Sequence, residues 1–451
     1  MGRLFGTDGV RGIANDELTP ELAFKIGRAG AYVLTGVGED KPRILVGRDT
    51  RISGGVLECA LVAGICSVGA EAVIAGVIPT PAIAHLVRSK GFDAGVMISA
   101  SHNPFEHNGI KYFSGSGYKL SDETEERIEG IILDNAEEIK APTGKDIGHI
   151  TYDDSLVYDY IKFAESTCGV RLDGLAIAID CANGASSVTA QKALEELGAE
   201  VFVINDKPNG ININDNCGST HIDGLKAFVA EKKADLGLAF DGDADRVLAV
   251  DENGELVDGD KIMAILALDM KERGCLKDNT VVATVMSNLG FFVMGSKHGL
   301  NIKRTKVGDR YVLEEMLKHN HLIGGEQSGH VILLEHNTTG DGLVTGIQLA
   351  SVLKRSEKKT SELASVMHVY PQVLENANVK NELKNEENYM KFPEIRAAIE
   401  KLESEFKDSG RVLIRPSGTE PLVRVMIEGD DRELIARKAK ELAKLFEEKL
   451  N

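Results

Sequence analysis

Short apolar stretches alternate along the chain with segments whose apolar residues recur at helical spacing. The stretches Arg43–Gly47, Ala72–Ala75 and Ala94–Ile98 have the length and apolar character of buried strands. Between the first two, a helix is predicted from about Gly54 to Val68. Because strands that alternate with helices form strand–helix–strand units, the pattern predicts an α/β fold with mixed, mainly parallel sheets.

A corner made of a helix end, a glycine and a strand recurs along the chain, at Gly69, Gly198 and Gly299. Each glycine stands where a helix ends and a positive φ is favoured. The unequal spacing of the corners argues against a solenoid and favours three similar α/β domains with different insertions. Such corners also occur in α/β proteins without repeats, so this observation is supporting evidence.

The last part of the chain has another pattern. A helical segment at Asn385–Lys407 precedes two apolar stretches, Arg411–Arg415 and Leu422–Glu428, and a charged helix starts at Asp431. This order predicts a C-terminal α+β domain. We therefore expect four domains, at residues 1–151, 152–253, 254–367 and 368–451.

Composition narrows the class of protein. The chain has 451 residues, 43% of them hydrophobic, which is enough for several packed cores. A net charge of −18 disfavours broad contact with nucleic acid or anionic membranes. The six cysteines lack metal-ligand spacing, so we expect buried, reduced thiols. With no secretion signal and no long apolar segment, we expect a cytoplasmic protein with no membrane contact.

The loop Ile98–Phe113 follows a predicted buried strand, where ligands of parallel sheets usually bind. Ser101 is followed by His102, and Lys111 lies ten residues further on. A serine that exchanges a phosphoryl group needs an exposed turn and a nearby basic group for the hydroxyl proton. The alternative is a polar turn in which Ser101 only caps.

In the segment Leu236–Val250, three carboxylates alternate after another predicted strand: Asp241, Asp243 and Asp245. Hard oxygen ligands so close together repel one another unless a divalent cation neutralises them, and Mg²⁺ is the natural candidate. One alternative is an acidic surface turn. Another is an aspartyl-phosphate phosphatase, in which Asp241 is the nucleophile.

Two further loops carry groups suited to a phosphorylated sugar. In Leu322–Leu333, the alternation of Glu326, Ser328 and His330 predicts an extended loop whose side chains point the same way. In Arg415–Glu428, hydroxyl and guanidinium groups surround a glycine turn, a combination that suits a terminal phosphate. These groups belong to Arg415, Ser417, Thr419 and Arg424. An ordinary hairpin is the alternative for each loop.

Two further segments are weaker indications of a functional site: FGTDGVRG, with Arg11, and KVGDRYV, with Gly308, Asp309 and Arg310. Either segment is equally well explained as a glycine turn with a solvated arginine. Taken together, FGTDGVRG, SASHNPFEHNGIKYF, DGDADR, GGEQSGH and RPSGTEPLVRVM resemble, in this order, the motifs of the α-D-phosphohexomutase superfamily. The resemblance runs from Arg3 to the C-terminus. It implies four domains around a central cleft, with one active-site loop from each.

The resemblance also implies roles for single residues. Ser101 is the phosphoserine, and its phosphate joins Asp241, Asp243 and Asp245 around one Mg²⁺. The further catalytic residues are Lys111, as general acid or base, His102, Arg11 and Arg246. The residues that bind the substrate are Gly308, Asp309, Glu326, Ser328 and His330. Those that hold the distal phosphate are Arg415, Ser417, Gly418, Thr419 and Arg424.

The activity that the resemblance implies is an intramolecular phosphotransfer between glucosamine 6-phosphate and glucosamine 1-phosphate. It uses phosphorylated Ser101, with glucosamine 1,6-bisphosphate as intermediate and primer, and supplies UDP-N-acetylglucosamine and cell-wall precursors. A phosphoglucomutase or phosphomannomutase reaction at the same site stays open, as do the phosphatase and a non-catalytic sugar-phosphate sensor. A homodimer is compatible with the resemblance.

Overall fold

The computed structural model describes residues 3–6, 8–35, 41–407, 409–417 and 420–451. The chain divides into two units, which are described in turn. The first comprises Met1–Met286 and Leu300–Val366, and the second comprises Ser287–Gly299 and Met367–Asn451.

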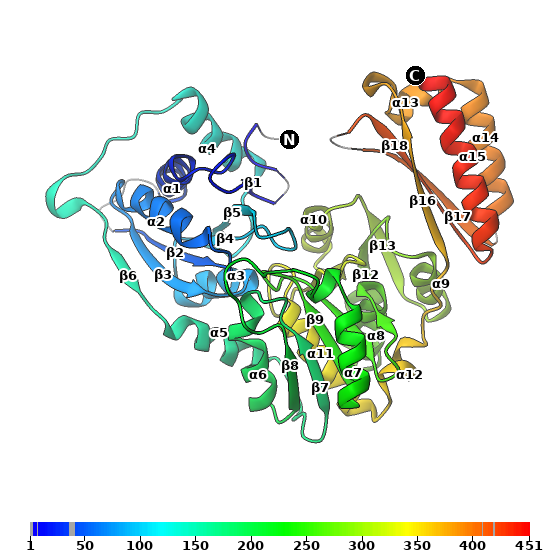
Figure 1. The fold of residues 1–451 in the computed structure, drawn as a ribbon, viewed down its shortest axis with the longest axis horizontal. Coiled ribbons are helices and arrows are strands. Elements are labelled where there is room, and N and C mark those ends of the chain that lie inside the picture. Colours follow the sequence, from blue (N-terminus) through cyan, green and yellow to red (C-terminus); the bar gives the residue numbers. More distant parts are fainter. Residues whose placement is uncertain (1–2, 7, 36–40, 408, 418–419) are drawn as a thin grey trace. The chain divides into compact units, whose positions relative to one another are not determined.

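The first sheet of unit 1 is built by the N-terminal third of the chain (Figure 1). Its strands are β1 (Val10–Ile13), β2 (Arg43–Arg48), β3 (Glu71–Val77), β4 (Ala94–Ile98), β5 (His107–Ser114) and β6 (Ile150–Tyr152), in the order β1–β5–β4–β2–β3–β6. Its helices are α1 (Pro20–Thr35), α2 (Gly54–Cys66), α3 (Thr80–Lys90) and α4 (Asp122–Asp134). The predicted strands and the helix after Gly54 are confirmed, the helix ending two residues earlier than expected.

Two further sheets complete unit 1. The second has strands β7 (Ala176–Asp180), β8 (Glu200–Ile204), β9 (Leu236–Phe240), β10 (Val247–Asp251) and β11 (Leu256–Val257), with α5 (Ser155–Ser166), α6 (Ala190–Glu196) and α7 (Asp223–Lys232). The third has strands β12 (Thr280–Thr284), β13 (Asn301–Thr305), β14 (Ile323–Gly325) and β15 (Val331–Leu333), with α8 (Gly259–Glu272), α10 (Asp309–His319), α11 (Gly342–Ser356) and α12 (Thr360–Ala364).

The three sheets share one topology. The strand orders β3–β2–β4–β5, β8–β7–β9–β10 and β13–β12–β14–β15 correspond, and in each the first three strands are parallel and the fourth is antiparallel. The glycines of the three corners have positive φ angles of 92°, 102° and 63°. The prediction of three similar α/β domains is therefore confirmed. The exact limits stay a prediction, and β11 joins the second sheet although it lies beyond residue 253.

Burial explains why these segments form central strands. β4 and β9 are buried along their whole length, as expected for strands covered on both faces. In the first domain, Ile44 and Val46 of β2 join a core cluster with apolar residues of α1, α2 and α4. Three of the candidate loops connect the last parallel strand of a sheet to its antiparallel neighbour: those predicted within Ile98–Phe113, Leu236–Val250 and Leu322–Leu333. The repeated topology thus places these loops at equivalent positions.

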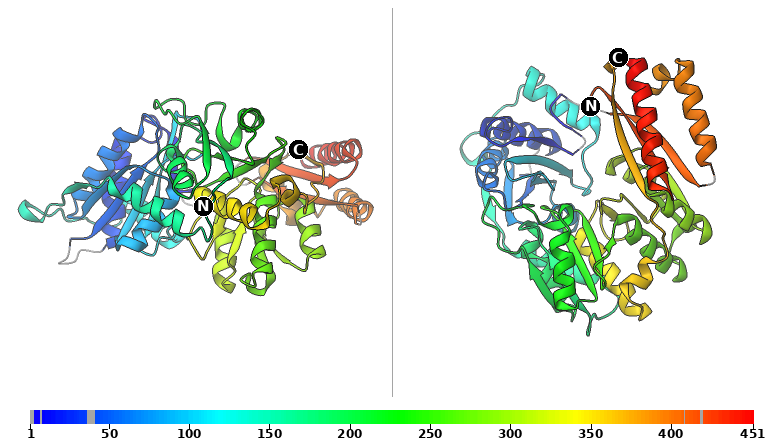
Figure 2. Two further views of the ribbon diagram at one scale, coloured as in Figure 1. Left: turned by 90° about the horizontal axis from the view of Figure 1, so that it is seen from below. Right: turned by 45° about the vertical axis from the view of Figure 1, so that its right-hand side comes forward.

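Unit 2 contains an antiparallel sheet covered by two long helices, which lie side by side along it (Figure 2). Its elements are α9 (Leu289–Lys297), β16 (Gln372–Asn378), α13 (Glu386–Tyr389), α14 (Pro393–Phe406), β17 (Gly410–Pro416), β18 (Leu422–Gly429) and α15 (Arg432–Leu450), with strand order β16–β18–β17. The α+β prediction is confirmed. The helical segment expected at Asn385–Lys407 contains two helices, because Phe392 is extended before Pro393, where proline disfavours the helical conformation.

The cysteine prediction needs one correction. Cys66, Cys181 and Cys217 are buried, but Cys59 is exposed and two others are half-buried. Cys59 lies on an outward position of α2, which the helical pattern did not separate from the buried positions. Among the described residues, we find no helix with the length and apolar content needed to cross a bilayer.

Candidate active site

Ser101 lies at the turn that leaves β4, as expected, but its side chain is only 1% exposed. The exposed serine expected from the sequence is therefore wrong, because the side chain is covered where the turn packs against the loop that contains Asp241. Its φ angle is +53°, a left-handed conformation that is uncommon for serine. The Ser101 hydroxyl donates a 2.6 Å hydrogen bond to Asp241 Oδ2. The first and second candidate loops therefore meet, although 140 residues separate these two side chains in sequence.

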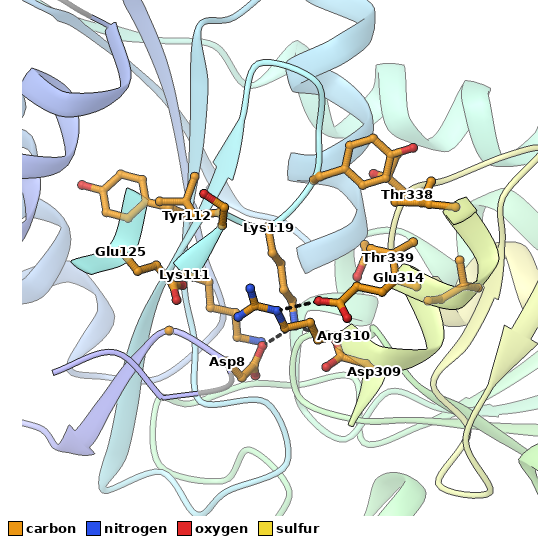
Figure 3. A pocket seen from close by; sticks show the side chains of 17 residues that line it. Asp8, Lys111, Tyr112, Lys119, Glu125, Asp309, Arg310, Glu314, Thr338 and Thr339 are labelled. Carbon is orange, nitrogen blue, oxygen red and sulfur yellow. Dashed lines mark hydrogen bonds and ion pairs between the residues drawn. The ribbon is translucent and has the colours of Figure 1, made fainter. Parts of the chain in front are cut away.

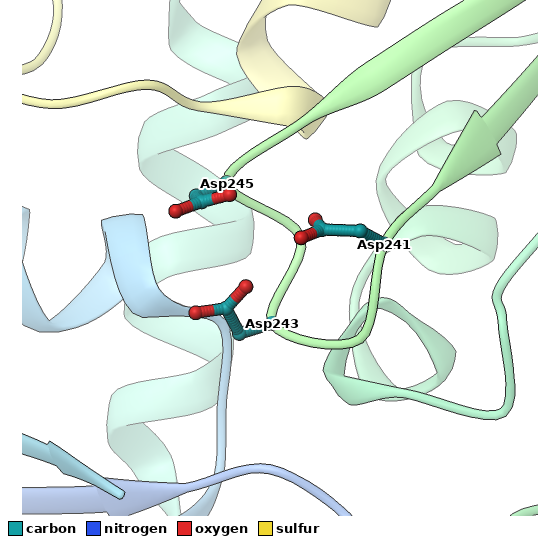
Figure 4. A group of neighbouring side chains, drawn as sticks. All are labelled: Asp241, Asp243 and Asp245. Atoms are coloured by element: carbon teal, nitrogen blue, oxygen red, sulfur yellow. The ribbon is translucent and has the colours of Figure 1, made fainter. Parts of the chain in front are cut away.

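Asp241, Asp243 and Asp245 converge in the connection between β9 and β10 (Figure 4). All three are buried, and one carboxylate oxygen of each lies within 4.8 Å of the others. The alternative of an acidic surface turn is therefore wrong. Burial, followed by the charges of Asp245 and Asp243, raises the pKa of Asp241 well above its ordinary value.

This set of oxygens fits a divalent cation. Among the described residues, Asp243 Oδ1 and Asp245 Oδ1 are buried with no hydrogen-bond partner. Buried carboxylate oxygens without partners are costly, and a hard cation such as Mg²⁺ satisfies such oxygens and relieves their repulsion. The donor set is therefore suited to Mg²⁺.

Lys111, on β5, brings a positive charge to the same site. Its side chain is 2% exposed, and its Nζ lies 2.8 Å from Asp243 Oδ2 and 3.1 Å from Asp8 Oδ2. Burial alone would lower the pKa of Lys111, but the Asp243 and Asp8 carboxylates outweigh it and raise that pKa. In this arrangement Lys111 carries a proton. Thr80, which sequence reasoning missed, donates a 2.6 Å hydrogen bond to Asp243 Oδ2.

Arg11 and Arg246 lie close enough to His102, the residue after Ser101, for their charges to act on its ring. Arg11 pairs with Asp8, and Arg246 Nε lies 3.7 Å from Asp245 Oδ1. His102 Nδ1 lies 3.4 Å from Ser101 Oγ. Burial, together with the charges of Arg246 and Arg11, lowers the pKa of His102 to about 4, so this ring is neutral near pH 7. The two arginines are thus permanent cations that act on the residue next to Ser101.

The third loop has a different shape from the one expected. Glu326 and His330 close a tight turn between β14 and β15, with Gly329 at φ +92°, so the extended loop was wrong. Ser328 is exposed, whereas His330 is 3% exposed, so the two do not share one face. The residue pattern could not show this, because a two-residue alternation also fits a hairpin in which glycine reverses the chain.

Gly308, Glu326 and Asp309 are nevertheless brought together. The Gly308 amide donates to Glu326 Oε1 at 3.1 Å. His330 Nε2 lies 3.8 Å from Asp309 Oδ2 and 3.9 Å from Asp245 Oδ2, which connects this loop to the metal-type carboxylates.

Lys119 links the first and third domains beside the site (Figure 3). Its Nζ lies 2.7 Å from Asp8 Oδ1 and 2.6 Å from Asp309 Oδ2. A pocket of about 240 Å³ adjoins this bridge, lined on one side by Arg310. Sequence reasoning missed Lys119 and Asp8. Asp8 lies within the FGTDGVRG motif, whereas no pattern distinguishes Lys119.

In unit 2, Arg415 and Arg424 face each other as a cross-strand pair of β17 and β18. Each has a buried Nε with no hydrogen-bond partner among the described residues. Ser417 accepts the Glu420 amide at 3.2 Å, and Glu420 Oε2 lies 3.3 Å from Arg424 Nη2. Two half-buried guanidinium groups so placed suit an anion. Gly418 and Thr419, also predicted here, lie outside the described residues.

Comparison with known proteins identifies the class. The chain matches, in order, the phosphoglucomutase/phosphomannomutase α/β/α domains I, II and III and the C-terminal domain, at residues 2–139, 158–254, 258–370 and 374–445. The solved structure of a phosphoglucomutase/phosphomannomutase family protein from Burkholderia thailandensis has a TM-score of 0.80 and 22% identity, covering 99% of this chain and 98% of that one. The chain belongs to the phosphoglucomutase/phosphomannomutase family.

Two named proteins match over nearly the full length of the chain. A protein of Acetivibrio thermocellus named phosphoglucosamine mutase is 62% identical over 450 residues, covering 100% of both chains. Aspergillus fumigatus N-acetylphosphoglucosamine mutase, solved with GlcNAc-6P and magnesium, has a TM-score of 0.67 and 18% identity, covering 99% of this chain and 95% of that one. At 18% identity, this second likeness shows the fold alone.

Proposed function

We propose that this chain interconverts glucosamine 6-phosphate and glucosamine 1-phosphate, with Ser101 as the phosphoryl carrier. The observation that carries the proposal is the 2.6 Å hydrogen bond between Ser101 and Asp241 inside a buried set of three carboxylates. The name of the Acetivibrio thermocellus relative supports the choice of an amino sugar. The cytoplasmic location and the homodimer stay predictions.

The reaction requires two transfers in opposite directions. Phosphorylated Ser101 first gives its phosphoryl group to the free hydroxyl of the monophosphate. The P–O bond to Ser101 Oγ breaks, a P–O bond to the sugar forms, and the product is glucosamine 1,6-bisphosphate. After the sugar turns around, its other phosphoryl group passes to Ser101 and leaves the isomeric monophosphate. Loose bisphosphate can prime an unphosphorylated chain by the same second step.

The residues around Ser101 would handle charge and protons. Asp241, Asp243, Asp245 and the Ser101 phosphate would hold Mg²⁺, which when bound offsets negative charge on the transferred group. Arg11 and Arg246 would stabilise the same charge from outside the metal. Lys111, protonated in this arrangement, would pass one proton between the sugar hydroxyl and Ser101 Oγ as the phosphoryl group moves the other way.

The remaining predicted residues would hold the sugar. Glu326, with Gly308 and Asp309, would bind the sugar hydroxyls, aided by Ser328 and His330. The distal phosphate would lie on the arginine pair, Arg415 and Arg424, with Ser417. Gly418 and Thr419 belong to the same proposed phosphate loop.

The test is phosphorus NMR of the phosphorylated protein with Mg²⁺, a trace of bisphosphate and equal amounts of glucosamine, glucose and mannose 6-phosphates. We expect glucosamine 1-phosphate to appear first. Faster glucose or mannose 1-phosphate would contradict the choice of substrate while keeping the phosphoserine. Free phosphate alone would favour a phosphatase.

The nucleophile is tested separately. Ser101→Ala should abolish turnover and phosphorylation while leaving the fold intact, because Ser101 lies in a loop and contributes little to a core. Phosphate on serine survives hydroxylamine, whereas an acyl phosphate on Asp241 would be released. A label that resists Ser101→Ala and is lost in hydroxylamine would overturn the proposal.

A further inference from the structure

Two side chains outside all the predicted motifs hold the backbone of the Ser101 turn. Arg51 Nη2 donates to the carbonyls of Ser101 and Asn103, at 2.9 and 2.8 Å. Asn214 Nδ2 donates to the same two carbonyls, at 2.9 and 3.1 Å. We call Arg51 and Asn214 the Ser101 clamp. Both carbonyls therefore accept from two different domains at once.

Arg51 is fixed from the side of the first domain. Its guanidinium is fully buried and pairs with Asp49 at 2.9 Å. Asp49 also accepts the Ser99 hydroxyl at 2.6 Å, and Ser99 Oγ in turn accepts the Ser101 amide at 2.9 Å. The amide and the carbonyl of Ser101 are thus both connected to one buried ion pair, which leaves this turn little freedom.

Asn214 brings the second domain into the same contact. It lies between β8 and α7, in the domain that carries the three aspartates, and is 7% exposed. The loop that contains Asp241, Asp243 and Asp245, which we call the metal-type loop, packs tightly against both residues. A Cβ placed on Gly242 of this loop would lie 2.6 Å from the Ser101 carbonyl oxygen and 2.9 Å from Asn214 Nδ2. The backbone of Ser101 is therefore held directly against the loop that contains Asp241.

We propose that Arg51 and Asn214 are positioning residues that hold the strained Ser101 turn in register with the metal-type loop. Neither side chain is needed to touch the reacting atoms. Their action is to keep Ser101 Oγ aimed at the carboxylate site, where a misplacement of about 1 Å is expected to slow transfer on the order of 100-fold. The catalytic part of this inference rests on the proposed phosphoryl transfer at Ser101.

Asn214→Gly is the sharpest test. Asn214 has a φ of +59°, a conformation that glycine adopts readily, so the change removes the amide donor with little effect on the backbone. Asn216→Gly is a matched control, because Asn216 lies in the same loop at φ +51° but is exposed and bonds to Asp215. Arg51 is a poorer target, since its loss would leave Asp49 buried without its charge partner.

Three measurements are made on each variant. Single-turnover transfer of label from phosphorylated enzyme to monophosphate gives the rate of the chemical step, and equilibrium binding gives the substrate affinity. Hydrogen–deuterium exchange reports the protection of the amides of residues 100–103 and 105. For Asn214→Gly we expect transfer to be slowed 10- to 100-fold, affinity to change less than about twofold and loop exchange to rise. Asn216→Gly should match the wild type in all three.

Each opposite result has a clear meaning. Transfer at the wild-type rate in Asn214→Gly, or a loss confined to affinity, would overturn the positioning role. If Ser101 of the wild-type chain took no phosphate label, the proposed function would be wrong. Hydrogen–deuterium exchange would still test the Ser101 clamp, because unchanged protection of the loop amides in Asn214→Gly would contradict it. If Asn214→Gly failed to fold, Asn214→Asp, which keeps the shape and lacks the amide donor, would replace it.

Discussion

Two regions of the molecule bring like charges close together: the loop of unit 1 with Asp241, Asp243 and Asp245, and the arginine pair of unit 2. The two regions differ in how deeply their charged groups are buried. Asp241, Asp243 and Asp245 are almost wholly buried. Arg415 and Arg424 are half-buried, and burial together with the charge of Arg424 lowers the pKa of Arg415. The buried oxygens suit a resident cation that stays through the reaction. The half-open guanidinium groups suit a phosphate that must enter and leave with each substrate.

The largest effect is expected at the acidic loop. Asp243→Asn should lower turnover roughly 1000-fold, because a bound metal contributes several kcal/mol to phosphoryl transfer. Turnover measured against Mg²⁺ concentration should also show a weaker metal dependence. Asp223→Asn, an exposed change at the start of α7, is the control. If Asp243→Asn kept full activity at limiting Mg²⁺, the acidic loop would not hold a cation that turnover needs.

The arginine pair should respond in another parameter. Arg424→Ala should raise the KM for the monophosphate about 10- to 100-fold, the range of one or two charge-assisted hydrogen bonds, and leave Mg²⁺ affinity unchanged. Steady-state kinetics and metal titration check this. Arg437→Ala, on an exposed position of α15, should behave as wild type. A change in metal affinity with an unchanged KM would contradict the division of roles.

Stability provides a third test. Because the pKa of Asp241 is raised in the folded chain, the wild type without metal should lose stability as the pH rises above the ordinary value of that carboxyl. Asp241→Asn should therefore raise the unfolding midpoint of the metal-free protein at pH 8 by roughly 3 °C. It should also abolish the further rise in midpoint that we expect from added Mg²⁺ in the wild type. Thermal unfolding of the wild type and of Asp241→Asn, with and without Mg²⁺, measures both effects. A midpoint of metal-free Asp241→Asn below that of the wild type would contradict repulsion among the three carboxylates.

The smallest expected effect lies beside the pocket next to Lys119. Burial raises the pKa of Glu125 to about 7, so the stability linked to this group is present below about pH 4.5 and lost as the pH rises toward 7. Glu125→Gln should raise the unfolding midpoint by about 2 °C at pH 8 and leave it unchanged at pH 4, since partial exposure screens the charge. Equal shifts at both pH values would exclude titration of Glu125 as the cause.

The local pattern was sufficient for much of the fold. Alternating apolar stretches predicted the parallel strands, and Gly69, Gly198 and Gly299 marked equivalent corners because positive φ favours glycine there. The carboxylates after β9 were recognisable because three of them follow one buried strand. The turn at Glu326–His330 was misjudged, because alternation of residue types does not reveal where a glycine reverses the chain.

By itself, the sequence determined the order of elements, the repeated α/β domains and the position of the polar loops after buried strands, because these depend on short-range periodicity and turn preferences. The resemblance of the motifs already implied that Ser101 lies beside Asp241, and the structure supplies their direct hydrogen bond. Only the tertiary structure decided that Thr80 and Lys111 hold Asp243 and that Lys119 joins two domains. The clamp of Arg51 and Asn214 belongs to this second group. Such contacts depend on how separately folded sheets dock against one another, and residue periodicity contains no information about that docking.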